Sequence, residues 1–164
     1  MWLAIDTATD RASLALGMPG RVLARETIVG ARNHASALLP ALDACLARAS
    51  ATREQIEGIA LADGPGSFTG LRVSAALAKA LVRVRPVPLW VAPSLLVCAA
   101  LPAPAMVLSV SNALRGELFA AAYALYAGRI ETLLAPTVIT PAALTTRVPP
   151  AVRIVGPAAP TLGG

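Results

Sequence analysis

The feature that most constrains the fold is a glycine-rich stretch between an apolar, strand-like run and a long helical pattern. Three glycines and a proline allow a tight turn and a close approach of backbones that side chains would block. Ser67 or Thr69 can cap the helix that follows, and a helix N-terminus attracts anions. The stretch therefore predicts a strand–turn–helix junction. Its residues are Gly64, Pro65, Gly66, Ser67, Phe68, Thr69, Gly70, Leu71 and Arg72.

This junction does not carry a recognised nucleotide-binding motif. No Lys-Ser or Lys-Thr pair follows Gly70, as a Walker loop requires, and the glycine spacing differs from the dinucleotide fingerprint. Two interpretations stay open from the glycines alone: a turn that packs a helix closely on a sheet, or a site for an anion.

The composition is that of a globular protein with a core of small side chains. The chain has 164 residues, of which 56% are hydrophobic, 14% charged and 4% aromatic. That length fits one ordinary domain or two small lobes. Packing is expected to depend on Ala, Leu and Val and on close helix contacts. Cys45 and Cys98 have no neighbouring ligand pattern, so both are expected to be buried, reduced thiols.

The net charge of +5 raises the possibility of a nucleic-acid surface. Lys79 is the single lysine, and the arginines are scattered, with the densest group at Arg83-Val84-Arg85. A contiguous basic face therefore cannot be inferred from the sequence.

A segment without charges, residues 87–114, is long enough to suggest a membrane span. It contains Pro88, Pro93, Pro102 and Pro104, and one helix in lipid could not satisfy so many broken backbone positions. The segment is better explained as a buried strand, a short helix and a second buried strand. Since the N-terminus also lacks a signal-peptide pattern, we expect a cytoplasmic protein.

The order of predicted elements indicates a mixed α/β fold. Three strands form an antiparallel meander, and alternating helices and strands follow, which implies right-handed crossovers. A second meander then begins, so we expect a lobe over residues 1–104 and an incomplete lobe of the same type over 105–164. Strands are predicted at 2–6, 12–17, 21–29, 57–62, 87–91, 106–111, 117–125, 129–138 and 152–155, and helices at 33–49, 68–83 and 93–100.

The string GPGSFTGLR resembles the hallmark of the TsaB (YeaZ) family of bacterial tRNA threonylcarbamoyladenosine biosynthesis proteins. The opening Leu3–Thr9, followed by Ala12–Leu16, is similar to that family's first hairpin. Arg32-Asn33-His34 with Leu38-Leu39-Pro40 resembles its first helix. These segments cover most of residues 2–82, and the resemblance weakens from there to Tyr126.

The resemblance implies the actin/Hsp70/sugar-kinase fold, also called ribonuclease H-like, with a second lobe that family members usually extend. One segment departs from the family pattern. Asn112 and Leu114 stand where an acid and an arginine are expected before Gly116-Glu117, although Arg115 is adjacent. A ligand role for this turn is weakened accordingly.

Asp6, Thr7 and His34 are the candidates for chemistry. In ATP-using members of the superfamily, an acid and a hydroxyl at the end of the first strand lie beside metal-bound phosphate. The resemblance favours a turn-capping role for Asp6 instead, because TsaB proteins look like degenerate paralogues of the transferase TsaD. His34 is the single histidine, so it cannot form a two-histidine metal site. A Ser67–His34–Asp63 relay lacks a nucleophile elbow.

The function implied by the resemblance is that of a non-catalytic scaffold in tRNA modification. The expected partners are a TsaD-like transferase, a TsaE-like ATPase through that pair, and tRNA indirectly. No cofactor is expected in the isolated chain, and ATP and metal are expected on the partner subunits. The alternatives are an ATP-dependent small-molecule kinase of the same superfamily and a metallopeptidase-like protein.

The two long helices are expected to supply the partner surface, because each has a second apolar face of small side chains besides its leucine-rich face. Without the partner, the same face is expected to form a homodimer. A glutamate at Ala41 or Ala78 is expected to abolish association while barely affecting the fold. The predicted contact residues are Ala37, Ala41, Ala44, Cys45, Ala75, Ala78, Lys79 and Val82.

Overall fold

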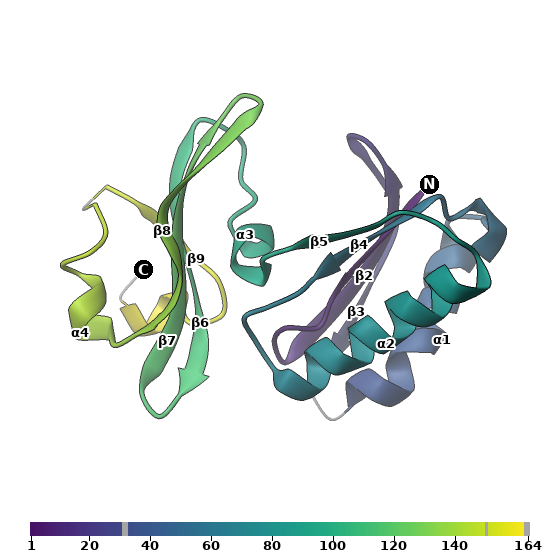
Figure 1. The fold of residues 1–164 in the computed structure, drawn as a ribbon, viewed down its shortest axis with the longest axis horizontal. Coiled ribbons are helices and arrows are strands. Elements are labelled where there is room, and N and C mark those ends of the chain that lie inside the picture. The colour runs from purple at the N-terminus through teal and green to yellow at the C-terminus, as the bar shows by residue number, and fades with distance from the viewer. Residues whose placement is uncertain (31–32, 150, 163–164) are drawn as a thin grey trace. The chain divides into compact units, whose positions relative to one another are not determined.

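The computed structural model describes residues 1–30, 33–149 and 151–162, so Arg32 of the first-helix motif lies outside the described residues. The chain forms two compact units, Met1–Ala92 and Pro93–Gly164 (Figure 1). This division falls earlier than the boundary predicted at residue 104, because the short helix α3 (Ser94–Cys98) contacts strands of the second unit.

The first unit contains a five-stranded mixed sheet in the order β3-β2-β1-β4-β5. The first three strands form the predicted antiparallel meander, and β4 and β5 add in parallel to β1. Alternation of apolar and polar side chains along β2 directs its buried residues to one face. The strands are β1 (Trp2–Asp6), β2 (Arg11–Met18), β3 (Arg21–Val29), β4 (Gly58–Ala62) and β5 (Leu89–Ala92).

Two helices, α1 (His34–Arg48) and α2 (Phe68–Val84), lie side by side on one face of this sheet (Figure 1). Leucines on one side of each helix pack against strand side chains that point to the same face of the sheet, every second residue along each strand. The helix α1 continues through Pro40. The core between the layers includes Leu3, Leu14, Leu16, Leu38, Leu42 and Ile59, all fully buried. Both predicted helices are confirmed.

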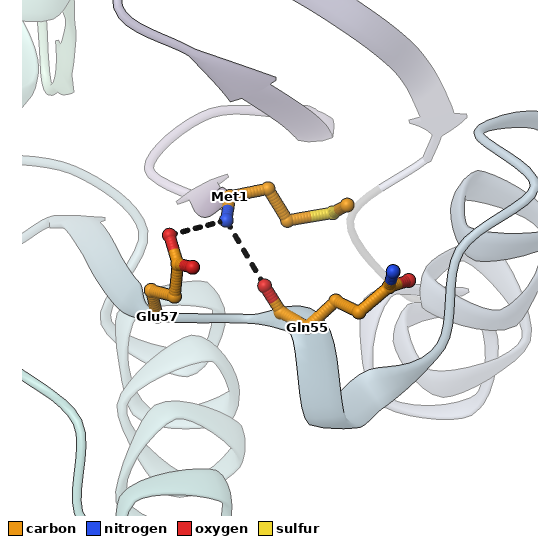
Figure 2. Close-up of polar contacts among 3 residues, drawn as sticks. All are labelled: Met1, Gln55 and Glu57. Atoms are coloured by element: carbon orange, nitrogen blue, oxygen red, sulfur yellow. Dashed lines mark hydrogen bonds and ion pairs between the residues drawn. The ribbon is translucent and has the colours of Figure 1, made fainter.

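The start of β1 is held against the segment that precedes β4. The Met1 ammonium donates hydrogen bonds to the Gln55 carbonyl at 3.0 Å and to the Glu57 carboxylate at 2.7 Å (Figure 2). Gln55 ends the 3-10 turn η2 (Arg53–Gln55). The ammonium also lowers the pKa of the exposed Glu57 carboxyl through this hydrogen bond. These contacts lie next to the first pair of the β1–β4 register, Trp2 with Gly58.

The second unit contains a four-stranded mixed sheet in the order β8-β7-β6-β9, and it repeats the meander with one parallel strand. One face carries α4 and η3, and the other face carries α3 (Figure 1). The elements are β6 (Ala105–Leu114), β7 (Glu117–Tyr126), β8 (Arg129–Ile139), α4 (Pro141–Leu144), β9 (Arg153–Val155) and η3 (Ala159–Leu162).

Two details of the second unit differ from the sequence-based expectation. The helical turns α4 and η3 were not predicted, since each is too short to show a helical period. β6 extends to Leu114 through a bulge, whereas a turn was expected from Asn112. There the Asn112 side-chain oxygen accepts a hydrogen bond from the Leu114 amide at 2.7 Å.

The uncharged segment 87–114 folds as the predicted strand, short helix and strand, which are β5, α3 and β6. The expectation that both strands are buried is correct for β6 and wrong for β5, because β5 is an edge strand whose Leu89, Trp90 and Val91 are exposed. In the part of the chain that the structure describes, no helix has both the length and the apolar character that a membrane crossing needs.

Candidate functional site

The glycine-rich stretch Gly64–Arg72, called the glycine loop below, follows the end of β4 at Ala62 and contains the start of α2 at Phe68. The predicted strand–turn–helix junction is therefore confirmed. Ser67 is the N-cap, and its hydroxyl oxygen accepts a hydrogen bond from the Gly70 amide at 3.3 Å. The Ser67 amide donates to the Ala8 carbonyl at 2.7 Å. The loop is therefore bonded to the turn that follows β1, and one amide that an anion would need is already used.

Two glycines make this close contact possible. A Cβ atom at Gly66 would lie 2.3 Å from the Ala8 carbonyl oxygen, and one at Gly70 would lie 2.1 Å from the Thr7 carbonyl oxygen. Neither backbone atom can give way as a flexible side chain can. The structure thus supports the interpretation in which the glycines pack a helix onto a sheet.

The Thr7 hydroxyl belongs to the same contact. It donates a hydrogen bond to the Gly70 carbonyl at 2.8 Å and lies 2.8 Å from the Ser74 hydroxyl oxygen. Thr7 and Ser74 are both fully buried. Sequence reasoning missed Ser74, although its position four residues after Gly70 places both on the same side of α2.

Asp6 ends β1, and its carboxylate accepts a hydrogen bond from the Ala8 amide at 2.9 Å. Burial raises the pKa of this carboxyl, and the hydrogen bond from Ala8 opposes the shift. An ionised Asp6 and a free Thr7 hydroxyl are what a phosphate-bound metal would need. The Thr7 hydroxyl does not fit that role, because it is fully buried under α2 and bonded to the Gly70 carbonyl.

His34 lies at the start of α1 with 1% of its surface exposed. Its Nε2 is 3.3 Å from the Asp10 carbonyl oxygen, so the ring joins α1 to the β1–β2 turn. Among residues 1–30, 33–149 and 151–162, no hydrogen bond links His34 to Ser67 or Asp63. Over the same ranges, no group of three or more His, Cys, Asp or Glu residues is placed to hold a metal ion.

Of the remaining residues of the glycine loop, some form the turn and others are exposed to solvent. Gly64 has a φ of 115°, a backbone conformation that favours glycine, and Pro65 follows it. Thr69 and Phe68 are exposed, and Phe68 has 73% of its surface accessible. The Arg72 guanidinium lies over the Phe68 ring, 5.2 Å from its centroid.

The predicted partner-contact residues are only partly on the surface. Cys45 and Ala78 are fully buried in the core of the first unit, so neither side chain is available to a partner. The expectation that Ala78→Glu would leave the fold intact is wrong for the same reason. Lys79 is exposed, and the half-buried residues beside the core are Ala37, Ala41, Ala44, Ala75 and Val82.

The structure exposes other apolar side chains on these helices that were not predicted as contacts. Leu39 on α1 is 50% exposed, beside the buried Leu38. Phe68 at the start of α2 is more exposed still. The leucine pair is a usable sequence signal here, because adjacent helical positions point about 100° apart and Leu39 falls outside the apolar stripe that contains Leu38 and Leu42.

Comparison with known proteins places this arrangement in a family. The model of the family described as TsaD, tRNA N6-adenosine threonylcarbamoyltransferase, matches residues 22–156. The tRNA threonylcarbamoyladenosine biosynthesis protein TsaB of Haemophilus influenzae is 38% identical over 79 residues, which cover 48% of this chain and 33% of that protein. TsaB of Bacillus subtilis is 28% identical over 134 residues, covering 80% of this chain and 58% of that protein.

These matches span about a third to somewhat over half of the length of the curated relatives. Among solved structures, YeaZ from Pseudomonas aeruginosa is similar with a TM-score of 0.77 and 27% identity. The similarity covers 93% of this chain and 70% of that one. The predicted actin-like fold with two lobes is thereby confirmed, and the chain belongs to the TsaB (YeaZ) family within the actin-like superfamily.

Proposed function

We propose that the chain is a non-catalytic scaffold subunit in the biosynthesis of threonylcarbamoyladenosine in tRNA. The relatives in Haemophilus influenzae and Bacillus subtilis carry that process in their names. On this proposal the protein works in the cytoplasm and pairs with a TsaD-like transferase. A TsaE-like ATPase and tRNA join through that pair, and ATP and metal are held by the partner subunits.

The observation that carries the scaffold role is the use of the glycine loop as a structural joint. The Thr7 hydroxyl and the Ser67 amide are both bonded within the protein, and two loop glycines lie against backbone carbonyl groups. These groups support the position of α2 on the sheet. We infer that the loop fixes the orientation of the helix pair and that association is the task of the helices.

The proposed partner surface is the solvent side of α1 and α2. Leu39 and Phe68 are its largest exposed apolar side chains, and the half-buried alanines border it. Exposed apolar side chains on adjacent helices favour burial against another helical surface. Large side chains at the centre of an interface usually supply most of its binding energy.

The test is direct binding between the full chain and the TsaD-like transferase of the same host, measured by calorimetry. Leu39→Glu should weaken binding at least about tenfold, because it places a charge in the contact. The matched control is Leu133→Glu, an exposed leucine on β8 of the second unit, which should bind like the wild type. Absence of wild-type binding at micromolar concentration would contradict the proposal.

A further inference from the structure

The exposed side of α2 carries a row of positive charges without any acidic residue. Arg72, Lys79 and Arg83 are all exposed, and no Asp or Glu occurs from Phe68 to Val84. Spacings of seven and four residues place the three side chains on one side of the helix, along about 16 Å of its length. The row therefore presents one sign of charge to whatever packs against it.

These cations are not neutralised within the protein. Among the described residues, none of the ion pairs includes Arg72, Lys79 or Arg83. The exposed acid of the neighbouring helix, Asp43, is already paired with Arg53. Arg85 lies beyond the C-terminal end of α2, near the acids Glu54 and Glu57, so it is not counted in the row. The pKa values of these two carboxyls are lowered mainly by hydrogen bonds, from Thr52 to Glu54 and from the Met1 ammonium to Glu57, and only slightly by Arg85.

We propose that this row selects an acidic helical surface on a partner protein and, in contrast to the homodimer expected from the sequence, disfavours pairing of the chain with itself. The inference rests on the proposed function, since it describes the same face of the helix pair. In a two-fold symmetric pair built on α2, each helix meets its own copy. Three cations would then face three cations, and α2 offers no acid to offset the repulsion.

An acidic protein surface fits the row better than RNA does, because apolar side chains lie among the charges. Phe68 is 73% exposed and Ala76 lies between Arg72 and Lys79 on the same side. The Arg72 guanidinium lies over the Phe68 ring, and a guanidinium stacked in this way can still pair with a carboxylate in bidentate fashion through its edge. Surfaces that contact nucleic-acid phosphates are more polar and more strongly charged.

The experiment is a mixing test with the charge-reversed chain R72E/K79E/R83E. Each chain alone should associate weakly, whereas the mixture should associate about tenfold more tightly at about 0.01 M salt. At about 1 M salt, where the Debye length falls to about 3 Å, the difference should disappear. Sedimentation velocity measures all three samples at both salt concentrations.

The matched control reverses three exposed arginines on other elements of the same unit, R11E/R21E/R25E, with the same change in net charge. A control mixture that tightens as much as the test mixture would overturn the inference. A test mixture no tighter than the wild-type chain alone would do the same. If the triple variant is unfolded by circular dichroism, K79E replaces it, with an expected gain of about threefold.

Two further binding measurements distinguish a protein partner from RNA. Binding of the wild-type chain to the host's TsaD-like transferase should weaken at least about tenfold in the triple variant and at high salt. If binding to the transferase changes neither in the triple variant nor at high salt, the proposed role of the charge row is contradicted, whereas the proposed function is not. Loss of tRNA-transcript binding in the triple variant, with no gain on mixing, would identify RNA as the occupant and overturn the inference.

Discussion

The two units use the same strand plan and cover their sheets differently. Each has a three-stranded meander, and a later strand, β4 or β9, pairs in parallel with its first strand. In the first unit, β2 alternates between buried and exposed residues, and both long helices lie on one face. In the second unit, nearly all of β7 is buried, because short helical turns cover both faces.

This difference shows what the long helices contribute. A meander with a parallel strand can be closed by the four-residue α4 as well as by the fifteen-residue α1. Buried residues run along α1 from His34 to Leu46, so one side of the helix covers the sheet over its whole length. The outward sides of α1 and α2 form the surface that we propose for a partner. The opposite face of the first sheet stays open, with Ala4 and Trp90 exposed.

The largest expected effect concerns a close contact between a glycine and a backbone carbonyl that occurs once within each unit. A Cβ at Gly70 would lie 2.1 Å from the Thr7 carbonyl oxygen, and one at Gly156 would lie 2.3 Å from the Val110 carbonyl oxygen. Gly70→Ala and Gly156→Ala should each destabilise their own unit by about 3 kcal/mol or more, because backbone must move. Denaturant titration followed by fluorescence measures this.

The chain provides a separate probe for each unit. Both tryptophans, Trp2 and Trp90, lie in the first unit, and both tyrosines, Tyr123 and Tyr126, lie in the second. Gly70→Ala should shift the tryptophan transition and Gly156→Ala the tyrosine transition. Equal shifts of both transitions in each variant would contradict the assignment of one such contact to each unit.

A smaller effect distinguishes the sheet covered on both faces from the sheet covered on one. Ala121 on β7 is fully buried, so Ala121→Leu should destabilise the second unit by about 2 kcal/mol through overpacking. Ala4 on β1 is exposed on the open face, so Ala4→Leu should change stability by less than about 0.5 kcal/mol. Thermal unfolding of the two variants compares them, and similar losses would show that the open face is packed.

The next effect concerns the hydroxyl that joins β1 to α2. Thr7→Val keeps the shape of the side chain and leaves the Gly70 carbonyl and the Ser74 hydroxyl without this partner. The first unit should lose about 1 kcal/mol, because buried polar groups are costly when unpaired. Thr7→Ser retains the hydroxyl and should recover most of the loss in chemical denaturation. A Thr7→Val variant as stable as the wild type would indicate that the hydroxyl is dispensable.

The smallest effect is the pH dependence contributed by Asp6. Because burial raises its pKa in the folded state, the folded protein holds this proton to higher pH than the unfolded chain. Ionised Asp6 therefore costs stability, and the cost develops as pH rises from the ordinary aspartate pKa through the raised value. Asp6→Asn should be slightly more stable than wild type near neutral pH and should lack this component. A wild-type stability that rises over that interval more than in Asp6→Asn would contradict the sign.

Much of the fold was predictable because its elements have clear periods. The alternation along residues 11–18 and the leucine spacing from 38 to 46 each specify one element. The loop motif also specified its own role as a junction. The partner surface was harder, because leucines and alanines both count as apolar and a helical period does not say which apolar side meets the sheet. Cys45 and Ala78 were misplaced for this reason.

The most direct test of the account asks whether Asp6 at the end of β1 or the outward side of the helix pair carries the function. The measurement is the amount of threonylcarbamoyladenosine formed in tRNA when this chain is combined with the other biosynthesis proteins of its host. The account predicts that Asp6→Asn keeps the wild-type rate within about twofold and that Leu39→Glu lowers it at least about tenfold. The reverse pattern, with Asp6→Asn inactive and Leu39→Glu active, would contradict the scaffold role.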